Sequence, residues 1–342
     1  MKKILIWNNK GGTGKTTLSF QLICEYASTH PESKILAIDV CPQANLSELM
    51  LGGLNQGGSR HLLEIQGKVP RPTIAGYFQI RLPSPYTIPM FNVFDYVSTP
   101  NDYNINIPKN IDIVCGDPLL ELQSTAISTL ANTQLPGINT WFAVISWIND
   151  FISKLSGQYD YIIFDANPSF SMYTQIAVAA ADLLVLPVMA DDSSRRAIQN
   201  AFSLVYGLKL PSEIYAKYAF AEKLKEANQP LPKVHLIVKN RLTQYMGAAS
   251  AYYSVLTSID ADVSKLLVSN PEIFDFTTIN NGVVEVRDFQ TTGVVSAARG
   301  CPFRNLKAGT LDLLGRRVQV KEEYRLNCIE NMTMLSHAVF NE

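Results

Sequence analysis

The sequence predicts an α/β fold, with a doubly wound, mostly parallel sheet and helices on both of its faces. Short apolar runs alternate with longer helical patterns along the 342 residues, which is the order of β-α-β units. The runs are rich in Ile, Val and Leu and lack polar alternation, as is typical of strands covered on both faces. Apolar residues make up 47% of the chain and charged residues 17%, as in an ordinary globular protein. The length suffices for one large domain or two small ones, and we interpret residues 1–342 as a single domain.

Strands and helices are expected in a regular order along the chain. The predicted strands are Lys3–Asn8, Lys34–Asp39, Ile111–Cys115, Tyr159–Asp165, Leu183–Val188 and Val234–Asn240. The predicted helices are Thr16–Ser28, Ile138–Leu155, Met172–Ala181, Ser194–Tyr206 and Ala248–Val268. Residues 52–110 are rich in Gly, Pro, Ser, Asn and Tyr, and we interpret them as a surface insertion with at most short helices, such as Thr73–Phe78. A second proline-containing stretch, residues 210–232, separates two helix–strand units.

The clearest motif is WNNKGGTGKTT at residues 7–17, between the first strand and the first helix. Glycines in such a turn let backbone N–H groups converge on phosphate oxygens, and the positive end of the next helix points at the same anion. Lys15 then reaches the β- and γ-phosphates, and the Thr16 hydroxyl ligates magnesium. A tight strand–helix connection without a ligand is the alternative, which the GKT sequence in this context disfavours. The motif predicts ATP with Mg²⁺, bound by Asn9, Lys10, Gly11, Gly12, Thr13, Gly14, Lys15, Thr16 and Thr17.

The start of this loop departs from the usual G-x-x-x-x-G-K-[ST] pattern. Asn9 stands at the first glycine position and Lys10 follows it, giving K-G-G-T-G-K-T. Here the sequence resembles the ParA and MinD ATPases, the deviant-Walker P-loop NTPases, whose loop carries an extra lysine at this place. The resemblance implies that Lys10 crosses a dimer interface and touches the phosphates of the partner's nucleotide. A second cation there would neutralise charge on the transferring phosphoryl group, whereas the alternative is a solvated lysine on a loop.

The resemblance to ParA covers most of the chain, and it rests on segments that are similar in order and spacing to the family's strands and turns. These segments are ILAIDVCPQANLSELM (35–50), NIDIVCGDPLLELQ (110–123), YDYIIFDANPSF (159–170, similar to the Walker B strand), AADLLVLPV (180–188) and GVVSAARGCPF (293–303). Residues 52–110 match least. Motif order and spacing fit ParA better than MinD.

Asp39 and Asp165 stand at the ends of predicted neighbouring strands. The carboxyl ends of parallel strands meet at one edge of a sheet, so both carboxylates are expected to face the loop. A carboxylate there holds magnesium directly or through water, and the alternative for each is a loop or helix-capping aspartate. We predict Thr16, Asp39 and Asp165 as metal ligands, and Lys10, Lys15, Asp39 and Asp165 as the catalytic residues.

Cys41 is the main departure from the ParA pattern, in which this position is usually the second aspartate of D-x-D and is linked to the attacking water. A thiol is a weak hydrogen-bonding partner and cannot supply the same general-base contact. Three interpretations follow for hydrolysis: it is slow and needs a partner, Asp191 or Asp192 substitutes, or the protein is a long-lived ATP-bound switch. We favour slow hydrolysis.

Two further positions are candidates for ligand or partner contacts. Asn240 follows a strand in VKNR, where the family often carries a polar residue near adenine, and the alternative is a loop-capping asparagine. Arg195 and Arg196 begin the helix after the fifth strand, where they either contact a partner subunit or are solvated arginines.

A formal net charge of −1 means that a nucleic-acid surface must be a local patch. The clearest basic excess lies in the C-terminal region, residues 296–342, which we interpret as helical. ParA-like dimers bind DNA without sequence preference through basic residues in such helices, and the alternative is a solvated helix face. The candidates for DNA contact are Arg299, Arg304, Lys307, Arg316, Arg317 and Lys321, with Arg325 beside them. No helix-turn-helix candidate precedes the loop, so sequence-specific repression is not expected.

Composition disfavours several other classes of protein. No stretch approaches the roughly 20 apolar residues that span a bilayer, and residues 327–342 lack Lys and Arg, so no membrane partner is expected. The five cysteines are scattered without metal-ligand spacing, which indicates reduced thiols in a cytoplasmic protein. An iron–sulfur reductase related to nitrogenase iron protein shares the loop, but Cys115 and Cys301 lie in no recognisable ligand motif.

The sequence therefore predicts an ATP-dependent, dimerising ParA-type ATPase that is cytoplasmic and nucleoid-associated. The resemblance implies a homodimer closed by ATP, non-specific DNA as partner, and a ParB-like protein that stimulates hydrolysis. The implied role is segregation of a plasmid or chromosome, or positioning of another cargo. The alternative is an ATP-gated regulatory switch that binds a protein and hydrolyses ATP very slowly.

Overall fold

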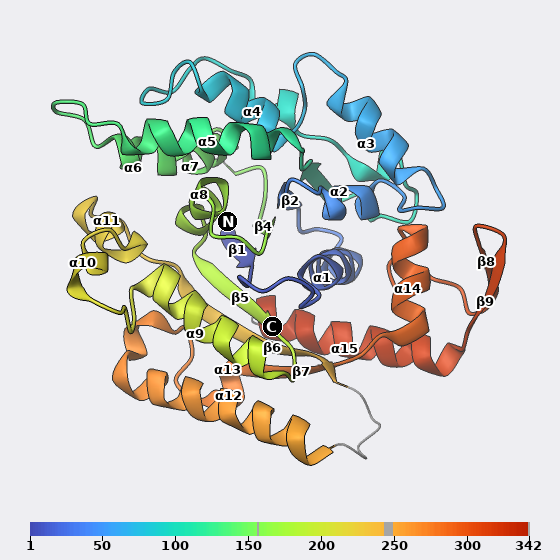
Figure 1. Ribbon diagram of the computed structural model, residues 1–342. Coiled ribbons are helices and arrows are strands. Elements are labelled where there is room, and N and C mark those ends of the chain that lie inside the picture. The colour runs from blue at the N-terminus through green and yellow to red at the C-terminus, as the bar shows by residue number, and fades with distance from the viewer. Residues whose placement is uncertain (156, 243–248, 341–342) are drawn as a thin grey trace.

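The apolar runs of the sequence pair into a parallel sheet at the centre of the molecule (Figure 1). The computed structural model describes residues 1–155, 157–242 and 249–340. Seven strands are ordered β3-β2-β4-β1-β5-β6-β7, and every neighbouring pair is parallel. Their bounds are β1 Lys2–Ile6, β2 Ile35–Val40, β3 Ile111–Val114, β4 Tyr161–Ala166, β5 Leu183–Val188, β6 Lys233–Leu242 and β7 Val283–Arg287. The predicted α/β fold class is confirmed.

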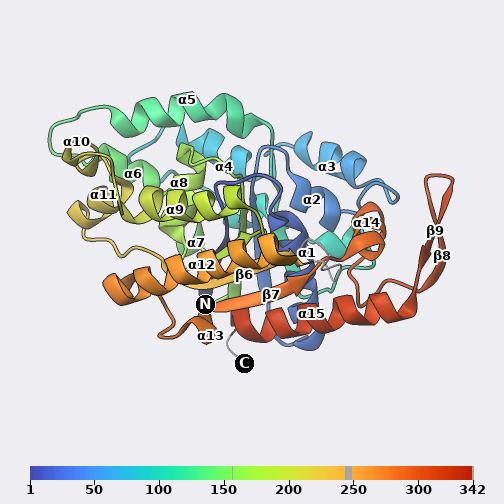
Figure 2. The same cartoon turned by 60° about the horizontal axis from the view of Figure 1, so that its bottom comes forward.

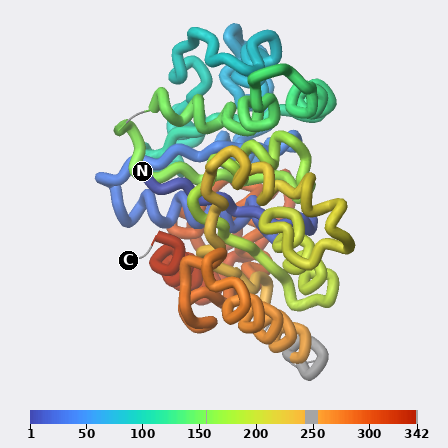
Figure 3. The backbone as a smooth tube through the Cα atoms, turned by 90° about the vertical axis from the view of Figure 1, so that its left-hand side faces the viewer, coloured from blue at the N-terminus to red at the C-terminus, as the bar shows by residue number. Residues whose placement is uncertain are grey.

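Both faces of the sheet are covered because successive strand residues point to opposite sides. In β1, Leu5 belongs to one apolar core, whereas Ile4 and Ile6 belong to the other. Figure 3 shows helices of the two layers, green α5 and red α15, on opposite sides of the blue first strand. The first core is covered by α4 Ile74–Arg81, α5 Leu119–Asn132, α6 Thr140–Ile145, α7 Trp147–Ser153, α8 Met172–Ala180, α9 Asp192–Tyr206, α11 Phe220–Glu226 and α12 Ala249–Ser269. The second is covered mainly by α1 Lys15–Thr29, α2 Asn45–Met50, α3 Gly58–Gln66 and α15 Glu322–Phe340.

The predicted strands all form, with ends that differ by a few residues. The predicted helix Ile138–Leu155 is divided into α6 and α7 at Ser146, and residue 248 of the predicted helix Ala248–Val268 lies outside the described residues. Strand β7 was not predicted because it is a half-exposed edge strand whose sequence, VVEVR, is not an apolar run. Short helices α10 Glu213–Ala216 and α13 Ile279–Gly282 complete the chain between the larger elements.

Residues 52–110 are less of a surface insertion than their composition suggests. They contain α3, α4 and the 3-10 turns η1 Val93–Tyr96 and η2 Pro100–Asp102; a further such turn, η4 Pro271–Ile273, lies after α12. Thr73 caps α4 by accepting a hydrogen bond from the backbone N–H of Gly76, as the predicted helix start requires. Tyr77 and Phe78 are fully buried in the first core. The segment therefore packs as part of the domain, because its aromatic side chains bury against α7.

The C-terminal region is only partly helical, which corrects the prediction for residues 296–342. Helix α14, Gln290–Arg299, is followed by an antiparallel hairpin of β8 Gly309–Leu313 and β9 Arg316–Val320, and then by α15. The turn between the strands has a left-handed backbone at Leu314 and Gly315, which is the geometry of a tight hairpin. Figures 1 and 2 show this hairpin projecting beyond the body of the molecule. Among the described residues, no helix is long and apolar enough to cross a membrane.

Candidate active site

The glycine-rich loop lies between β1 and α1, at the edge of the sheet where the parallel strands end. Asn8 fixes its start, because its side-chain N–H donates to the carbonyl of Pro187 on β5 (2.7 Å) and its Oδ1 accepts from the N–H of Lys10 (3.1 Å). Gly12 and Gly14 have φ of +76° and +84°, a left-handed region that other residues rarely adopt. A side chain at Gly14 would also collide with Asn240, so the loop is shaped for glycine. Its last turn leads directly into the N-terminus of α1, which favours an anion.

Lys15 is buried at the start of α1 and folds back over the loop. Its Nζ donates to the carbonyl of Lys10 (2.9 Å), so the ammonium lies inside the curve of the loop. Burial lowers the pKa of Lys15, while the nearby carboxylate of Asp165 opposes that shift. An ammonium desolvated in this way gains from an added anion, which suits the predicted contact with the β- and γ-phosphates.

Three buried polar atoms around the loop have no hydrogen-bond partner among the described residues: Asn9 Oδ1, Thr13 Oγ1 and Asn240 Oδ1. Buried polar atoms without partners are uncommon and are costly unless a ligand satisfies them. The side-chain N–H of Asn240 donates to the carbonyl of Thr13 (2.9 Å), which places Asn240 against the loop although it follows a distant strand. The predicted role of Asn240 near a nucleotide base stays a prediction, now with an acceptor atom available for it.

Asp165 joins the end of β4 to the start of α1. Its two carboxylate oxygens accept hydrogen bonds of 2.8 Å from the hydroxyls of Thr16 and Ser19. Burial raises the pKa of Asp165 above its usual range. A hydroxyl and a carboxylate side by side at the end of the phosphate loop are hard oxygen donors of the kind that Mg²⁺ prefers, so these residues fit the predicted metal. Thr16 and Asp165 remain the predicted ligands.

Asp39 is adjacent to Asp165 in the strand register but has a different environment. It is fully buried, and both of its oxygens are occupied: Oδ1 accepts from the N–H of Cys41 (3.1 Å), and Oδ2 accepts from the N–H and hydroxyl of Ser47 (2.9 and 2.7 Å). Burial and the neighbouring Asp165 raise its pKa. In this arrangement Asp39 holds the turn between β2 and α2, and direct ligation of a metal would require it to give up these bonds.

Lys10 does not extend into solvent. Its Nζ donates to both carboxylate oxygens of Asp191 (2.6 Å each) and to the hydroxyl of Ser194 (3.0 Å). Asp191 also caps α9, because it accepts from the N–H of Ser194 (2.7 Å). Although partial burial alone would raise it, the hydrogen bonds from Lys10 and its other donors lower the pKa of Asp191 to about 2. The loop lysine is therefore paired within its own subunit in this structure.

Cys41 lies beside these carboxylates as a neutral thiol. Burial and the neighbouring Asp39 raise its pKa to about 12. Of the two aspartates proposed to replace it, Asp191 is paired with Lys10 and Asp192 with Arg196. Arg195 pairs with Asp262 of α12 (3.0 Å). Asp191, Asp192, Arg195 and Arg196 therefore all have partners within the chain.

Among the described residues, no group of three His, Cys, Asp or Glu side chains could hold a metal. All five cysteines are buried, and none forms a disulfide.

Some of the predicted DNA-contact residues already interact with other residues of the chain, and others have exposed side chains without such contacts. Arg304 forms a two-pronged ion pair with the buried Glu25, and Arg325 pairs with Glu322 (2.6 Å), so both hold the C-terminal region in place. Arg299 donates to the carbonyl of Asp312 (3.2 Å), and Lys321 lies over the ring of Tyr324. Within the described part of the chain, no hydrogen bond or ion pair engages the side chains of the exposed residues Lys307, Arg316 and Arg317.

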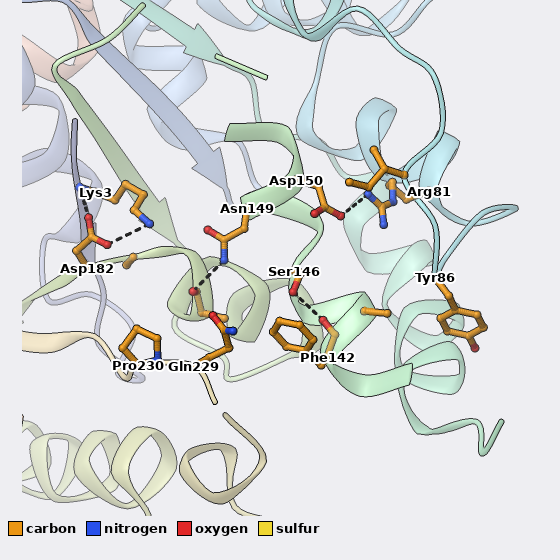
Figure 4. A pocket seen from close by; sticks show the side chains of 14 residues that line it. Lys3, Arg81, Tyr86, Phe142, Ser146, Asn149, Asp150, Asp182, Gln229 and Pro230 are labelled. Carbon is orange, nitrogen blue, oxygen red and sulfur yellow. Dashed lines mark hydrogen bonds and ion pairs between the residues drawn. The ribbon is translucent and has the colours of Figure 1, made fainter. Parts of the chain in front are cut away.

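A separate cavity of about 560 Å³ opens at the opposite edge of the sheet, where β1 and β5 begin (Figure 4). The ion pairs Lys3–Asp182 (3.0 Å) and Arg81–Asp150 (2.6 Å) lie in its wall. Because both cations are already neutralised and the phosphate loop lies at the other edge, this cavity is not part of the nucleotide site.

Several residues of the site were not found from the sequence. Asn8, Ser19, Ser47 and Ser194 each position a predicted residue through a hydrogen bond. Only Ser19 carried a readable signal, because it stands four residues after Lys15 and so shares its face of the helix. The others act across turns or between distant strands, and single small polar residues there do not stand out in a sequence.

The chain resembles known proteins in sequence over residues 1–210 and in fold over nearly its whole length. Residues 1–210 match the family described as AAA domain. The cell division protein PomZ of Myxococcus xanthus is 27% identical over 209 residues, which are 61% of this chain and 52% of PomZ, so the chain spans about half the length of that relative. Among solved structures, an ATP complex of a Cyanothece McdA variant has a TM-score of 0.60 at 15% identity, covering 99% of this chain and 96% of that one. The ParA of pNOB8 bound to nonspecific DNA has a TM-score of 0.52 at 15% identity, covering 100% and 99%. At these identities the solved structures show the shared fold.

Proposed function

Because this chain belongs to the AAA domain family, as one of its ParA-type P-loop ATPases, we propose that it is an ATP-driven dimerising switch that acts on DNA. The observation that carries the proposal is the paired lysines of one phosphate loop: Lys15 is buried inside the loop, and Lys10 is held at its rim. Lys15 alone is enough to bind the phosphates of the subunit's own nucleotide. Lys10 is suited to bind a nucleotide that a partner subunit presents.

The chain's own residues divide the handling of ATP among them. The loop N–H groups and Lys15 hold the β- and γ-phosphates, and the free acceptor of Asn240 lies ready for a donor such as the adenine amino group. Thr16 and Asp165 would hold Mg²⁺, which would neutralise negative charge on the phosphates. Asp39 braces the turn that carries Cys41, because it accepts hydrogen bonds from the N–H of Cys41 and from the hydroxyl of Ser47. Hydrolysis then ends the dimeric state.

Dimerisation is tested by light scattering coupled to size exclusion. We expect a monomer with ADP and a dimer with a non-hydrolysable ATP analogue, because only the γ-phosphate gives Lys10 of the other subunit an anion to bind. A monomer in both states would reject the dimerising switch. A dimer in both states would show that association does not depend on the nucleotide.

DNA binding is supported by the structural neighbour bound to nonspecific DNA, the ParA of pNOB8, and by the exposed basic residues of the C-terminal region. The ATP-bound dimer is expected to bind random-sequence duplex in a salt-sensitive way, since phosphate contacts release counterions. A ParB-like protein would stimulate hydrolysis and release the DNA, so that the cycle segregates a plasmid or chromosome or positions a cargo on the nucleoid. If no ATP-dependent binding is found, the protein-binding regulatory switch becomes the better assignment, and the neutral thiol at Cys41 favours slow turnover in either case.

Substitution of Cys41 by aspartate is expected to accelerate hydrolysis. The thiol is neutral and a weak acceptor, whereas a carboxylate at this position could orient or deprotonate the attacking water. We expect single-turnover phosphate release to rise by about tenfold or more, within the range of general-base catalysis. Cys41→Ser is the matched control, because it keeps the size and the absence of charge and should remain slow. Equal rates for Cys41→Asp and the parent would show that Cys41 does not limit hydrolysis.

Loss of the charge on Asp191 is expected to favour the dimer. Lys10 must leave Asp191 to reach a partner's nucleotide, and Asp191→Asn keeps a good helix cap while it removes the ion pair. A half-exposed pair contributes on the order of 1 kcal/mol or less, so we expect the dimer dissociation constant under an ATP analogue to fall by roughly three- to tenfold. Asp192→Asn, on the same turn, is the control and should leave it unchanged. A weaker Asp191→Asn dimer would mean that Asp191 acts across the interface instead.

A further inference from the structure

The hairpin at residues 309–320, here called the arm, is separate from the central sheet. In the part of the chain that the structure describes, its two strands pair only with each other, and Figures 1 and 2 show it standing out from the body beside α14. An isolated two-stranded hairpin is marginally stable in water, so an arm of this kind needs an anchor.

The anchor is an apolar face and a pair of hydrogen bonds. Leu311, Leu313, Val318 and Val320 share one side of the arm and pack with Val295 of α14, Cys301 and Leu306. The carbonyl of Asp312 accepts hydrogen bonds from the side chains of Arg299 (3.2 Å) and Asn55 (3.3 Å). These two hydrogen bonds hold the arm at Asp312, two residues before its turn, while the apolar side chains pack along its length. The tip is therefore presented in a fixed direction.

The arm and its flanks carry a local positive charge. Between residues 307 and 321 there are four basic residues, Lys307, Arg316, Arg317 and Lys321, against one acidic residue, Asp312, so this stretch is +3 in a chain of −1. Among the described residues, the carboxylate of Asp312 forms no ion pair with either arginine, and its Oδ2 accepts from the N–H of Gly315 in the turn (3.3 Å). Arg316 and Arg317 are exposed, and no ion pair binds either of them within the described residues.

Leu314 lies at the tip, 66% exposed and next to these arginines. Among the residues that the structure describes, Leu314 belongs to none of the apolar cores, so packing within the subunit does not explain its position. A two-stranded ribbon is narrow enough to enter the major groove of B-form DNA, where arginines can reach phosphates on either side and an apolar tip can contact base edges such as the thymine methyl group.

We propose that the arm is the element that engages duplex DNA, entering the major groove with Arg316 and Arg317 on the phosphates and Leu314 toward the bases. This rests on the proposed function and assigns its DNA contact to a β-ribbon, whereas the sequence had assigned it to helices. The alternative basic residues of the region, Arg304 and Arg325, are committed to Glu25 and Glu322. A dimer would present two such arms to the same duplex.

The test measures fluorescence anisotropy of a random-sequence duplex with the full chain and a non-hydrolysable ATP analogue, over a range of salt concentrations. The double variant Arg316→Gln/Arg317→Gln should bind at least tenfold more weakly, and its log–log salt slope should be shallower by about two for each arm that engages. Leu314→Ser should bind several-fold more weakly with an unchanged slope, because it removes an apolar contact and no charge. Lys217→Gln/Lys225→Gln removes the same charge from the residue after α10 and from α11, on the far side of the molecule, and should bind like the parent.

Light scattering of each variant with the ATP analogue separates this proposal from the function on which it rests. If the parent and the arm variant both dimerise and bind DNA equally well, the arm proposal is overturned and DNA binding stands. That result is also the one expected of an arm that docks a protein. If the parent itself binds no duplex, the DNA function and the arm fail together.

Discussion

Lys15→Gln is expected to abolish nucleotide binding. The ammonium of Lys15 lies buried inside the loop, where burial lowers its pKa and makes a charged partner more valuable than it would be in water. Replacing it by an amide of similar length removes the cation that meets the β- and γ-phosphates and leaves the loop backbone in place. We expect the affinity for ATP to fall by about 100-fold or more, as loss of a buried charge-assisted contact implies, and turnover to fall below detection. Titration with a fluorescent ATP analogue measures the first effect.

Lys109→Gln is the matched control for this variant, because it removes one lysine from an exposed position after η2 and should bind ATP like the parent. The thermal transition of Lys15→Gln should stay close to that of the parent, since the ammonium of Lys15 makes one hydrogen bond among the described residues, to the carbonyl of Lys10. ATP binding within a factor of three of the parent would contradict the assignment of the loop as the nucleotide site.

Lys10→Ala is expected to separate binding from dimerisation. The variant keeps Lys15, Thr16 and Asp165, so each subunit should still bind ATP with nearly the parent's affinity. It should fail to dimerise with an ATP analogue, and turnover should fall on the order of 10³-fold, the range known for a cation supplied to a transferring phosphoryl group. Light scattering and steady-state phosphate release measure the two effects. A variant that dimerises and turns over as the parent does would exclude Lys10 from the reaction.

A mixture of the two variants tests whether Lys10 acts on the other subunit's nucleotide. A Lys10→Ala subunit binds ATP but offers no loop lysine, whereas a Lys15→Gln subunit offers Lys10 but holds no nucleotide. If the lysine acts across the interface, a mixed dimer has one complete site, and mixing should restore part of the turnover that each variant lacks alone. If Lys10 acts within its own subunit, mixing restores nothing. Recovery is therefore specific to the cross-subunit arrangement.

The sequence by itself determined the fold class and the position of the phosphate loop, which is the candidate nucleotide site. Strands buried on both faces must be continuously apolar, so β1, β2, β4, β5 and β6 could be read from runs of Ile, Val and Leu. The phosphate loop could be read because its chemistry is local: Gly12, Gly14, Lys15 and Thr16 act through neighbouring backbone and one helix end. The pairing of β2 with β4 also follows the expectation that Asp39 and Asp165 lie side by side.

Only the tertiary structure decided which of these side chains are available to bind a ligand. Asp39 accepts hydrogen bonds from Ser47, and this decides whether its carboxylate can ligate a metal. Lys10 pairs with Asp191, 181 residues away in the chain, and this decides whether its ammonium can reach a nucleotide. The same holds for Arg304 and for Arg316, which look equivalent in sequence. One is bound to Glu25 across the second core, and the other is exposed on a hairpin whose strands are too short and too polar to be recognised. A motif whose residues are neighbours in the sequence can be recognised from the sequence. A hydrogen bond between distant elements forms only when the fold brings its donor and acceptor together, so it cannot be recognised in this way.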